Sequence, residues 1–267
     1  MIPGLGPEYA AQFDDASVVA AYGTRPPYPD ALIDWIVACC GSAAPEVIDL
    51  GCGTGELTRR LAPRVRSVTA IDASPRMLRT ARSLPGGTAP NITWMPGSVE
   101  ESPVVRAFDV AVAAESFHWF DWPGACRRVR GWIPTAALLI VEGRFEIASA
   151  WADSLSPIIA EFSTNRAFQP YDLVAELESR GYVRVRERTR WHHTFDQSID
   201  DYVTSIHSRN GFSRDRMTHA RATAFDDAVR RLVAPHARNG IVTLLVETRA
   251  TATVVRDELR ELAWRYD

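Results

Sequence analysis

The segment over residues 47–61 is the feature that most constrains the fold of this chain. A short apolar run at 47–50 ends in the glycine run G-C-G-T-G at 51–55, and a helix-like stretch follows at 56–61. A strand that ends in a glycine-rich turn and opens a helix presents backbone N–H groups to a ligand, and its glycines let the ligand approach closely. The segment therefore predicts a βα unit that cradles a nucleotide-like molecule.

The same rhythm of strand and helix continues through the first half of the chain. Further strands are predicted at 68–71, 92–95, 108–113 and 136–141, and later ones at 182–191 and from Ile241 to Val246 or Val255. Helices are predicted at 7–22, 56–61 and 75–82, with helical stretches at 151–180 and 198–234. Strands that alternate with helices form βαβ units, so the pattern predicts an α/β fold with a doubly wound, parallel sheet.

Composition excludes several classes of protein. Of the 267 residues 46% are hydrophobic and 24% charged, which is typical of a globular chain. A net charge of −3 gives no general attraction to nucleic acid or to an acidic membrane. The four cysteines form no C-x-x-C pair, no apolar run approaches the ~20 residues of a membrane span, and the first twenty residues lack the basic charge of a signal peptide. We therefore expect a cytoplasmic protein that binds neither nucleic acid nor membrane.

Spacing within the glycine run separates the ligand classes that use such a loop. A P-loop requires a lysine, and all 30 basic residues of this chain are arginine. Dinucleotide binding requires G-x-G-x-x-G, whereas here the third glycine of Gly51, Gly53 and Gly55 comes one place early. A P-loop is excluded, and the spacing disfavours a nicotinamide-dependent oxidoreductase.

Residues 49–55 resemble the D-x-G-x-G-x-G motif of class I S-adenosylmethionine-dependent methyltransferases. The resemblance implies that Asp49 faces the ammonium group of the cofactor and that Asp72, at the end of the second strand, accepts hydrogen bonds from its ribose. It also implies that Ser98 lies beside the adenine and Glu115 near the methionine moiety. Many members of the family have an aspartate where this chain has Ser98.

Two further signatures narrow the resemblance. R-P-P-Y-P at 25–29 and H-W-F-D at 118–121 are similar to those of the trans-aconitate methyltransferase-like subgroup, which acts on small molecules. The family usually has R-V-L-x-P-G-G before the fifth strand, whereas this chain has R-V-R-G-W-I-P-T-A at 128–136. The cofactor residues implied are Tyr22, Arg25, Asp49, Gly51, Cys52, Gly53, Gly55, Asp72, Ala73, Ser98, Val99 and Glu115.

The resemblance also implies an organisation of the whole chain. It predicts a Rossmann-like sheet of seven strands, mostly parallel, with an antiparallel last strand. The predicted units are an N-terminal helical lid (1–29), a cofactor-binding core (30–149), a helical cap with one core strand (150–235), and the last strand with a C-terminal tail (236–267). We expect a monomer or a homodimer.

Methyl transfer from a sulfonium is an in-line displacement, in which the protein mainly aligns the acceptor with the methyl group. The subgroup suggests O-methylation of a carboxylate or a hydroxyl on a small molecule. A hydroxyl needs a base, and His118 is the leading candidate, although its H-W-F-D run could equally build an aromatic wall. Trp119 and His207 are further candidates for contact with the acceptor.

Other interpretations stay open at this point. An intact glycine loop also fits an S-adenosylmethionine-binding regulator without transferase activity. The adjacent His192 and His193 point to opposite faces of a strand, and no metal site is expected. Four arginines at 184, 186, 188 and 190 alternate along the same strand, which indicates one solvated face or a surface for an anionic partner.

Overall fold

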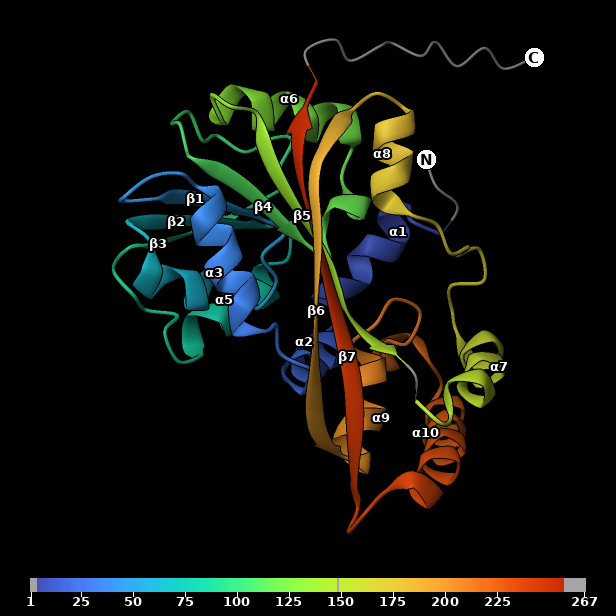
Figure 1. Ribbon diagram of the computed structural model, residues 1–267. Coiled ribbons are helices and arrows are strands. Elements are labelled where there is room, and N and C mark those ends of the chain that lie inside the picture. The colour runs from blue at the N-terminus through green and yellow to red at the C-terminus, as the bar shows by residue number, and fades with distance from the viewer. Residues whose placement is uncertain (1–3, 148, 257–267) are drawn as a thin grey trace, which may run out of the picture.

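The computed structural model describes residues 4–147 and 149–256, whose strands form one seven-stranded sheet (Figure 1). The strands are β1 (Glu46–Leu50), β2 (Ser67–Asp72), β3 (Ile92–Pro96), β4 (Val110–Ala114), β5 (Ala137–Ile147), β6 (Val183–Ser198) and β7 (Ile241–Val255). Their order across the sheet is β3-β2-β1-β4-β5-β7-β6. Strands β1 to β5 pair in parallel, and β7 runs antiparallel to both of its neighbours. The prediction of a mostly parallel sheet with an antiparallel last strand is confirmed.

Helices cover both faces of this sheet, as its buried strands require. They are α1 (Pro7–Ala10), α2 (Ala16–Ala21), α3 (Asp30–Cys39), α4 (Glu56–Leu61), α5 (Pro75–Ser83), α6 (Trp122–Trp132), α7 (Ala152–Phe162), α8 (Leu173–Ser179), α9 (Ile199–His207) and α10 (His219–Val233). Apolar side chains of α3 and α4 form a core with one face of the sheet, and those of α6 and α8 form a core with the other. None of the described helices is both long and apolar enough to cross a membrane.

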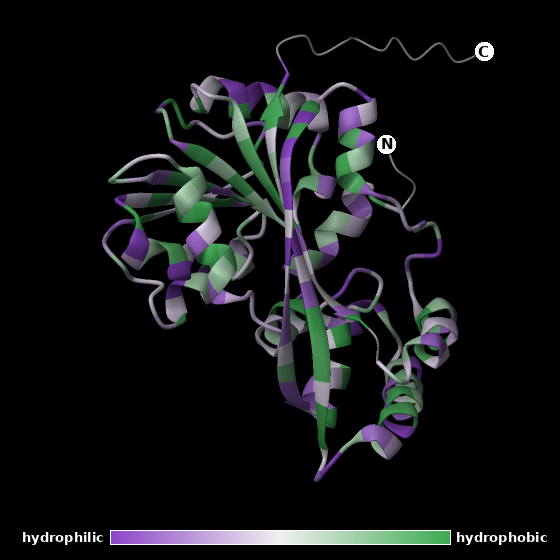
Figure 2. Ribbon diagram, in the orientation of Figure 1, coloured by the Kyte–Doolittle hydropathy of each residue, from purple (hydrophilic) through white to green (hydrophobic). Residues whose placement is uncertain are grey.

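Strands β6 and β7 are the longest and extend beyond the parallel part of the sheet (Figure 1). At their far end α7, α9 and α10 enclose a separate apolar cluster, and we call these three helices the helical cap. Figure 2 shows β7 mainly hydrophobic in this part, whereas the edge strand β6 is mainly hydrophilic. The largest buried members of the cluster and its β7 members are Trp151, Tyr202, Phe212, Phe225, Val242, Leu244 and Val246.

The predicted helix at 7–22 is interrupted, and this part of the prediction is wrong. α1 and α2 are separated by a 3-10 turn (Ala11–Asp14) and by Asp15, whose backbone is extended at φ −65° and ψ 137°. The Asp15 carboxylate accepts hydrogen bonds from Ser213 Oγ and Arg216 Nε, both at 2.6 Å. Such side-chain bonds compete with helix formation. We call residues 4–25 the N-terminal strap.

Two later predictions also need correction. The strand predicted at 182–191 continues to Ser198, because residues 192–198 pair with β7. The helical stretch predicted at 151–180 is two helices, α7 and α8, joined by a connection that contains Pro170, which cannot donate a helical hydrogen bond. The predicted C-terminal tail falls mostly on 257–267, outside the described residues.

The four arginines of β6 do not share one face. A bulge between Val185 and Glu187 shifts the register, so that Arg184 pairs with Val254 whereas Arg188 pairs with Thr251. Directly paired residues point to the same face and successive residues alternate. Arg184 therefore lies on the opposite face of the sheet from Arg188, and the single arginine face predicted from the alternation is wrong.

Candidate active site

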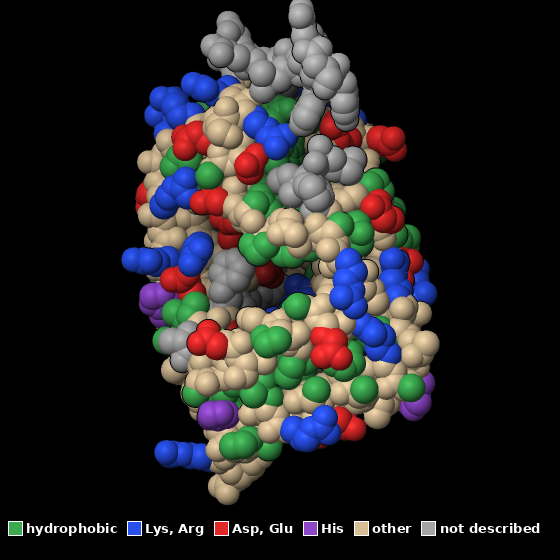
Figure 3. Space-filling view, turned by 90° about the vertical axis from the view of Figure 1, so that its right-hand side faces the viewer, with side chains coloured by type: hydrophobic (Ala, Val, Ile, Leu, Met, Phe, Trp, Pro, Cys, Tyr) green, Lys and Arg blue, Asp and Glu red, His purple; other side chains and the backbone are tan. Residues whose placement is uncertain are grey.

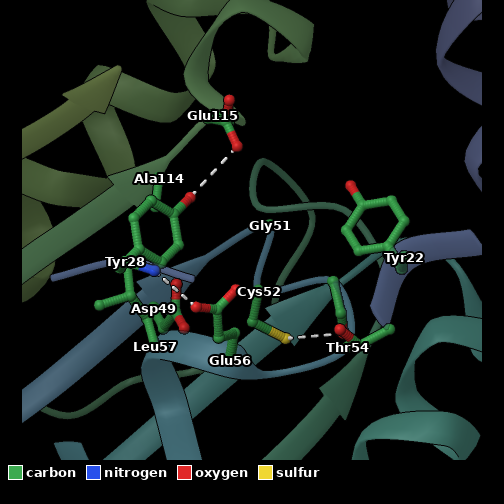
Figure 4. A pocket seen from close by; sticks show the side chains of 11 residues that line it. Tyr22, Tyr28, Asp49, Gly51, Cys52, Thr54, Glu56, Leu57, Ala114 and Glu115 are labelled. Carbon is green, nitrogen blue, oxygen red and sulfur yellow. Dashed lines mark hydrogen bonds between the residues drawn. The ribbon is translucent and has the colours of Figure 1, made fainter. Parts of the chain in front are cut away.

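Two adjoining cavities lie at the carboxyl ends of β1, β4 and β5. The order of strands reverses between β1 and β4, and open α/β sheets bind ligands at such a point. The glycine-loop cavity is lined by Tyr22, Tyr28, Asp49, Gly51, Cys52, Gly53, Thr54, Glu56, Leu57, Ala114 and Glu115 (Figure 4). The aromatic cavity, of about 240 Å³, is lined by Leu5, Ala113, Glu115, Ser116, Phe117, His118, Trp119, Ile140, Val141, Glu142, Gly143, Phe168, Tyr171, Leu173 and Asn210. Glu115 lines both.

The glycine loop turns sharply because its three glycines have left-handed backbones. The φ angles of Gly51, Gly53 and Gly55 are +70°, +56° and +71°. A Cβ at Gly51 would lie 2.5 Å from Ser116 Cβ, so a side chain cannot fit there. The N–H groups of residues 51 and 52 both donate to the Ile71 carbonyl, at 2.8 and 3.0 Å. The loop is thereby fixed to the end of β2.

Asp72 ends β2 beside this loop. Its carboxylate accepts hydrogen bonds from the N–H groups of Gly53 at 2.7 Å and Ser74 at 2.8 Å. Burial raises the pKa of Asp72, and these two hydrogen bonds act in the opposite direction. The carboxylate is therefore held in a fixed orientation against the glycine loop.

Asp49 lies at the end of β1 beneath the loop and is 1% exposed. Burial raises the pKa of Asp49 to about 7, against the hydrogen bond that its carboxylate accepts from Thr58 Oγ1 at 2.5 Å. A buried carboxylate is costly unless a cation or donors compensate it. Asp49 is thus suited to a ligand that brings a positive charge.

The glycine-loop cavity as a whole is acidic. Asp49, Glu56 and Glu115 line it, and Arg, Lys and His are absent from its described lining. Such a set fits a ligand with a cationic centre and hydroxyl groups, whereas the pyrophosphate of a dinucleotide would meet carboxylates. The geometry agrees with the glycine spacing in disfavouring a nicotinamide cofactor.

Glu115 stands at the junction of the two cavities. Its backbone is left-handed at φ +51°, which is strained for a residue other than glycine, and its N–H donates to the Val141 carbonyl at 2.8 Å. Its carboxylate accepts a hydrogen bond from the Tyr28 hydroxyl at 3.3 Å (Figure 4). Arg25 Nη1 lies 3.7 Å from the same carboxylate. Tyr28 was not among the predicted site residues, although it belongs to the R-P-P-Y-P signature.

The aromatic cavity contains His118 and Trp119, whose ring centroids are 4.7 Å apart. Burial lowers the pKa of His118 to about 4, while the charge of Glu115 raises it and that of Arg25 lowers it. Trp119 also packs against Phe13 of the N-terminal strap, with centroids 5.3 Å apart. The side of the molecule that carries α7 and α8 is hollowed between them (Figure 3).

Twelve of the fifteen described residues that line this cavity were not predicted from the sequence, and two of the twelve have ionisable side chains. Glu142 lies on β5 and Tyr171 on the connection between α7 and α8. Both come from segments without a motif, so no signal in the sequence marks them.

Six of the predicted cofactor residues lie outside the lining of both cavities. Two of the six make contact with residues of the lining. The Asp72 carboxylate accepts a hydrogen bond from the Gly53 N–H, and Arg25 lies beside Glu115. A Cβ at Gly55 would lie 2.3 Å from Trp94, so that glycine serves the packing of the turn. The six residues are Arg25, Gly55, Asp72, Ala73, Ser98 and Val99.

The other three of these six follow β2 and β3. The Ser98 hydroxyl accepts a hydrogen bond from the Glu101 N–H at 3.2 Å. Val99 is buried in the core, and Ala73 is exposed. Their predicted contacts with the cofactor stay predictions.

His207 was predicted to contact the acceptor, but it lines neither cavity. It is fully buried, with Nδ1 2.7 Å from the Phe212 carbonyl oxygen and Nε2 2.7 Å from Asp226 Oδ1. Both ring nitrogens are engaged within the helical cap and the segment 208–218 between α9 and α10, which we call the cap connection. The structure therefore does not bring His207 to the site.

Comparison with known proteins finds similarity to methyltransferases. A family model described as Methyltransferase domain matches residues 47–133. An uncharacterized methyltransferase of Mycobacterium tuberculosis is 36% identical over 146 residues, which are 54% of this chain and 57% of that protein. A malonyl-[acyl-carrier protein] O-methyltransferase of Halalkalibacterium halodurans is 34% identical over 101 residues, 35% of this chain and 37% of that protein. The chain thus spans little more than half the length of the first relative.

Solved structures share the fold. A methyltransferase from Thiobacillus denitrificans, described as S-adenosylmethionine-dependent and solved with S-adenosylhomocysteine, has a TM-score of 0.52 at 16% identity, over 87% of this chain and 94% of that one. A protein of Anaeromyxobacter dehalogenans with a provisional type II methyltransferase assignment has a TM-score of 0.62 at 20% identity, over 86% and 97%. Residues 47–133 match the methyltransferase domain family, and the chain has the Rossmann-like methyltransferase fold.

Proposed function

We propose that this protein transfers the methyl group of S-adenosylmethionine to a small molecule. The observation that carries the proposal is the pair of cavities that meet at Glu115, one acidic beside a glycine loop and one aromatic. The first suits a cationic nucleoside cofactor and the second an acceptor with an apolar body. The matched methyltransferase domain supports the same reaction.

The residues of the glycine-loop cavity and its border would hold the cofactor. Asp49 compensates its ammonium group, Asp72 accepts hydrogen bonds from its ribose, and Tyr22, Arg25 and Cys52 border it. Bound there, the cofactor supplies a methyl group on a sulfonium, whose carbon–sulfur bond breaks as the bond to the acceptor forms and whose sulfur keeps the electron pair. Glu115, which lines both cavities, would lie between cofactor and acceptor.

An acceptor hydroxyl fits the aromatic cavity better than an acceptor carboxylate. Glu115 and Glu142 line this cavity and would repel a carboxylate, and the described lining contains no Arg or Lys. His118 is neutral at pH 7 because its pKa is about 4, so its imidazole can accept the hydroxyl proton. His118 can act as a weak base that takes the proton as the oxygen–methyl bond forms, because the oxygen becomes acidic as it is methylated. The name of an O-methyltransferase relative supports oxygen as the acceptor atom, although a malonyl group offers a carboxylate oxygen and no hydroxyl.

The N-terminal strap is proposed to act as a lid. Asp14 accepts a hydrogen bond from Ser74 Oγ at 2.6 Å beside the glycine-loop cavity, and Gln12 Oε1 accepts one from the Gly211 N–H at 2.8 Å in the cap connection. The strap therefore bridges the glycine-loop part of the sheet and the cap connection, and it can exclude water during methyl transfer.

The first experiment is a calorimetric titration with S-adenosylhomocysteine, with NAD as the comparison. One-to-one micromolar binding of the first and none of the second is expected. Transfer of labelled methyl groups from S-adenosylmethionine to a panel of phenols, alcohols and carboxylic acids then tests the reaction. Binding without transfer to any acceptor would favour a regulator that binds the cofactor without catalysis.

A further inference from the structure

The aromatic cavity contains an acid that methyl transfer to a hydroxyl does not use. Glu142 lies on β5, half-buried, and lines the cavity on the same face of the strand as Ile140. Within the described part of the chain no hydrogen bond or ion pair engages its carboxylate. Burial raises its pKa, as expected for a half-buried carboxylate that accepts no hydrogen bond.

Two arginines lie near Glu142, but neither lines the aromatic cavity. Asp172 raises the pKa of Glu142, whereas Arg249 and Arg188 lower it. Arg249 is paired directly opposite Glu142 on β7, and its Nε is 2.5 Å from Glu247 Oε1, so two carboxylates share its charge. Tyr171 stays protonated, because burial and the charge of Glu142 raise its pKa.

The walls of the same cavity are apolar and aromatic. Phe117, Trp119, Phe168 and Tyr171 line it, and aromatic faces attract organic cations. An apolar chamber with a carboxylate that accepts no hydrogen bond from the described residues therefore suits a molecule with an apolar body and a positive charge.

We propose that the acceptor is a hydroxylated organic cation, a protonated amine on an apolar body, whose ammonium group pairs with Glu142. The inference rests on the proposed function and specifies its substrate class. Glu142 acts as a specificity residue: it touches the acceptor at a group that does not react. A carboxylate in place of the ammonium group would face Glu142 and be repelled.

The test uses three sets of hydroxylated aromatic fragments, matched in size and ending in an ammonium, a neutral or a carboxylate group. Tyramine, 4-propylphenol and 3-(4-hydroxyphenyl)propionate form one such triplet. Binding to the protein saturated with S-adenosylhomocysteine is measured by ligand-observed NMR. We expect binders mainly in the ammonium set, and Glu142→Gln to weaken them by about tenfold or more, as for loss of a partly buried charge pair. The neutral set should bind the variant as before.

Glu161→Gln on α7 is the matched control, because Glu161 is exposed and lines neither cavity. An ammonium set without binders, a preference for carboxylates, or ammonium binding that Glu142→Gln leaves unchanged would overturn the proposal. S-adenosylhomocysteine binding together with labelled methyl transfer tests the proposed function separately, so the two failures are distinguishable.

Discussion

The glycine-loop cavity and the aromatic cavity touch at Glu115 but are assembled in different ways. Most residues that line the first lie within 49–57, one strand end and the turn that follows it. The second draws on the strap, on 113–119, 140–143 and 168–173, and on Asn210 in the cap connection. The lining of the glycine-loop cavity is thus mostly local in the chain, whereas the aromatic cavity forms only when distant segments pack together.

The largest expected effect lies in the aromatic cavity. His118→Ala should slow methyl transfer to a hydroxyl by about 10²–10⁴-fold, the usual contribution of a general base. Because the pKa of His118 is about 4, the wild-type rate should be flat above about pH 5 and fall as the imidazole is protonated near pH 4. Single-turnover rates across pH check both points. A near-normal rate with intact cofactor binding would assign His118 to the aromatic wall.

The next largest effect is expected on cofactor binding alone, and it therefore distinguishes the two cavities. Asp72→Ala should weaken S-adenosylhomocysteine binding by about 1–3 kcal/mol, through lost charge-assisted hydrogen bonds. Binding of fragments in the aromatic cavity should not change. Calorimetry on the variant measures the first and NMR the second, and unchanged cofactor affinity would refute the ribose assignment.

Asp49→Asn removes a carboxylate from the glycine-loop cavity, and its effect is measured on the folding stability of the protein without ligand. The folded pKa of about 7 lies above the unfolded value of 3.8, so the stability contributed by protonated Asp49 is full below about pH 4 and is lost as pH rises through 7. Asparagine stays neutral, so the variant should exceed the wild type at pH 8 by on the order of 2 kcal/mol. Urea unfolding at pH 5 and pH 8 measures this, with Glu161→Gln as control. An identical pH dependence in variant and wild type would contradict the shift.

The smallest effects come from two adjacent strap residues. Asp14 binds Ser74 in the core, whereas Asp15 binds Ser213 and Arg216 in the cap connection. Asp14→Ala should weaken cofactor binding about fivefold and Asp15→Ala should raise the acceptor KM about fivefold, each from roughly 1 kcal/mol of hydrogen bonding. Calorimetry and steady-state kinetics measure the two effects. Equal effects of both variants on both ligands would mean that the strap does not distinguish the two cavities.

Much of the fold could be predicted from the sequence, because strand length, glycine spacing and helix period are local signals. Asp49, Gly51 and Gly53 were identifiable for the same reason. The break at Asp15 and the bulge near Val185 were not, because each depends on partners far along the chain. Glu142 lacked any motif, and only the packing of β5 against the α7–α8 connection brings it into a cavity.

The path of β6 and β7 has a consequence for engineering. Both strands run without interruption from the parallel sheet into the helical cap, so the cap is not an appendage on a hinge. A chimaera that exchanges the cap for that of another protein must be spliced within paired strands and must preserve their register. The hairpin from Val183 to Val255 carries only α9 and α10 of the helical cap, so such a graft must also take α7, which lies before it in the chain.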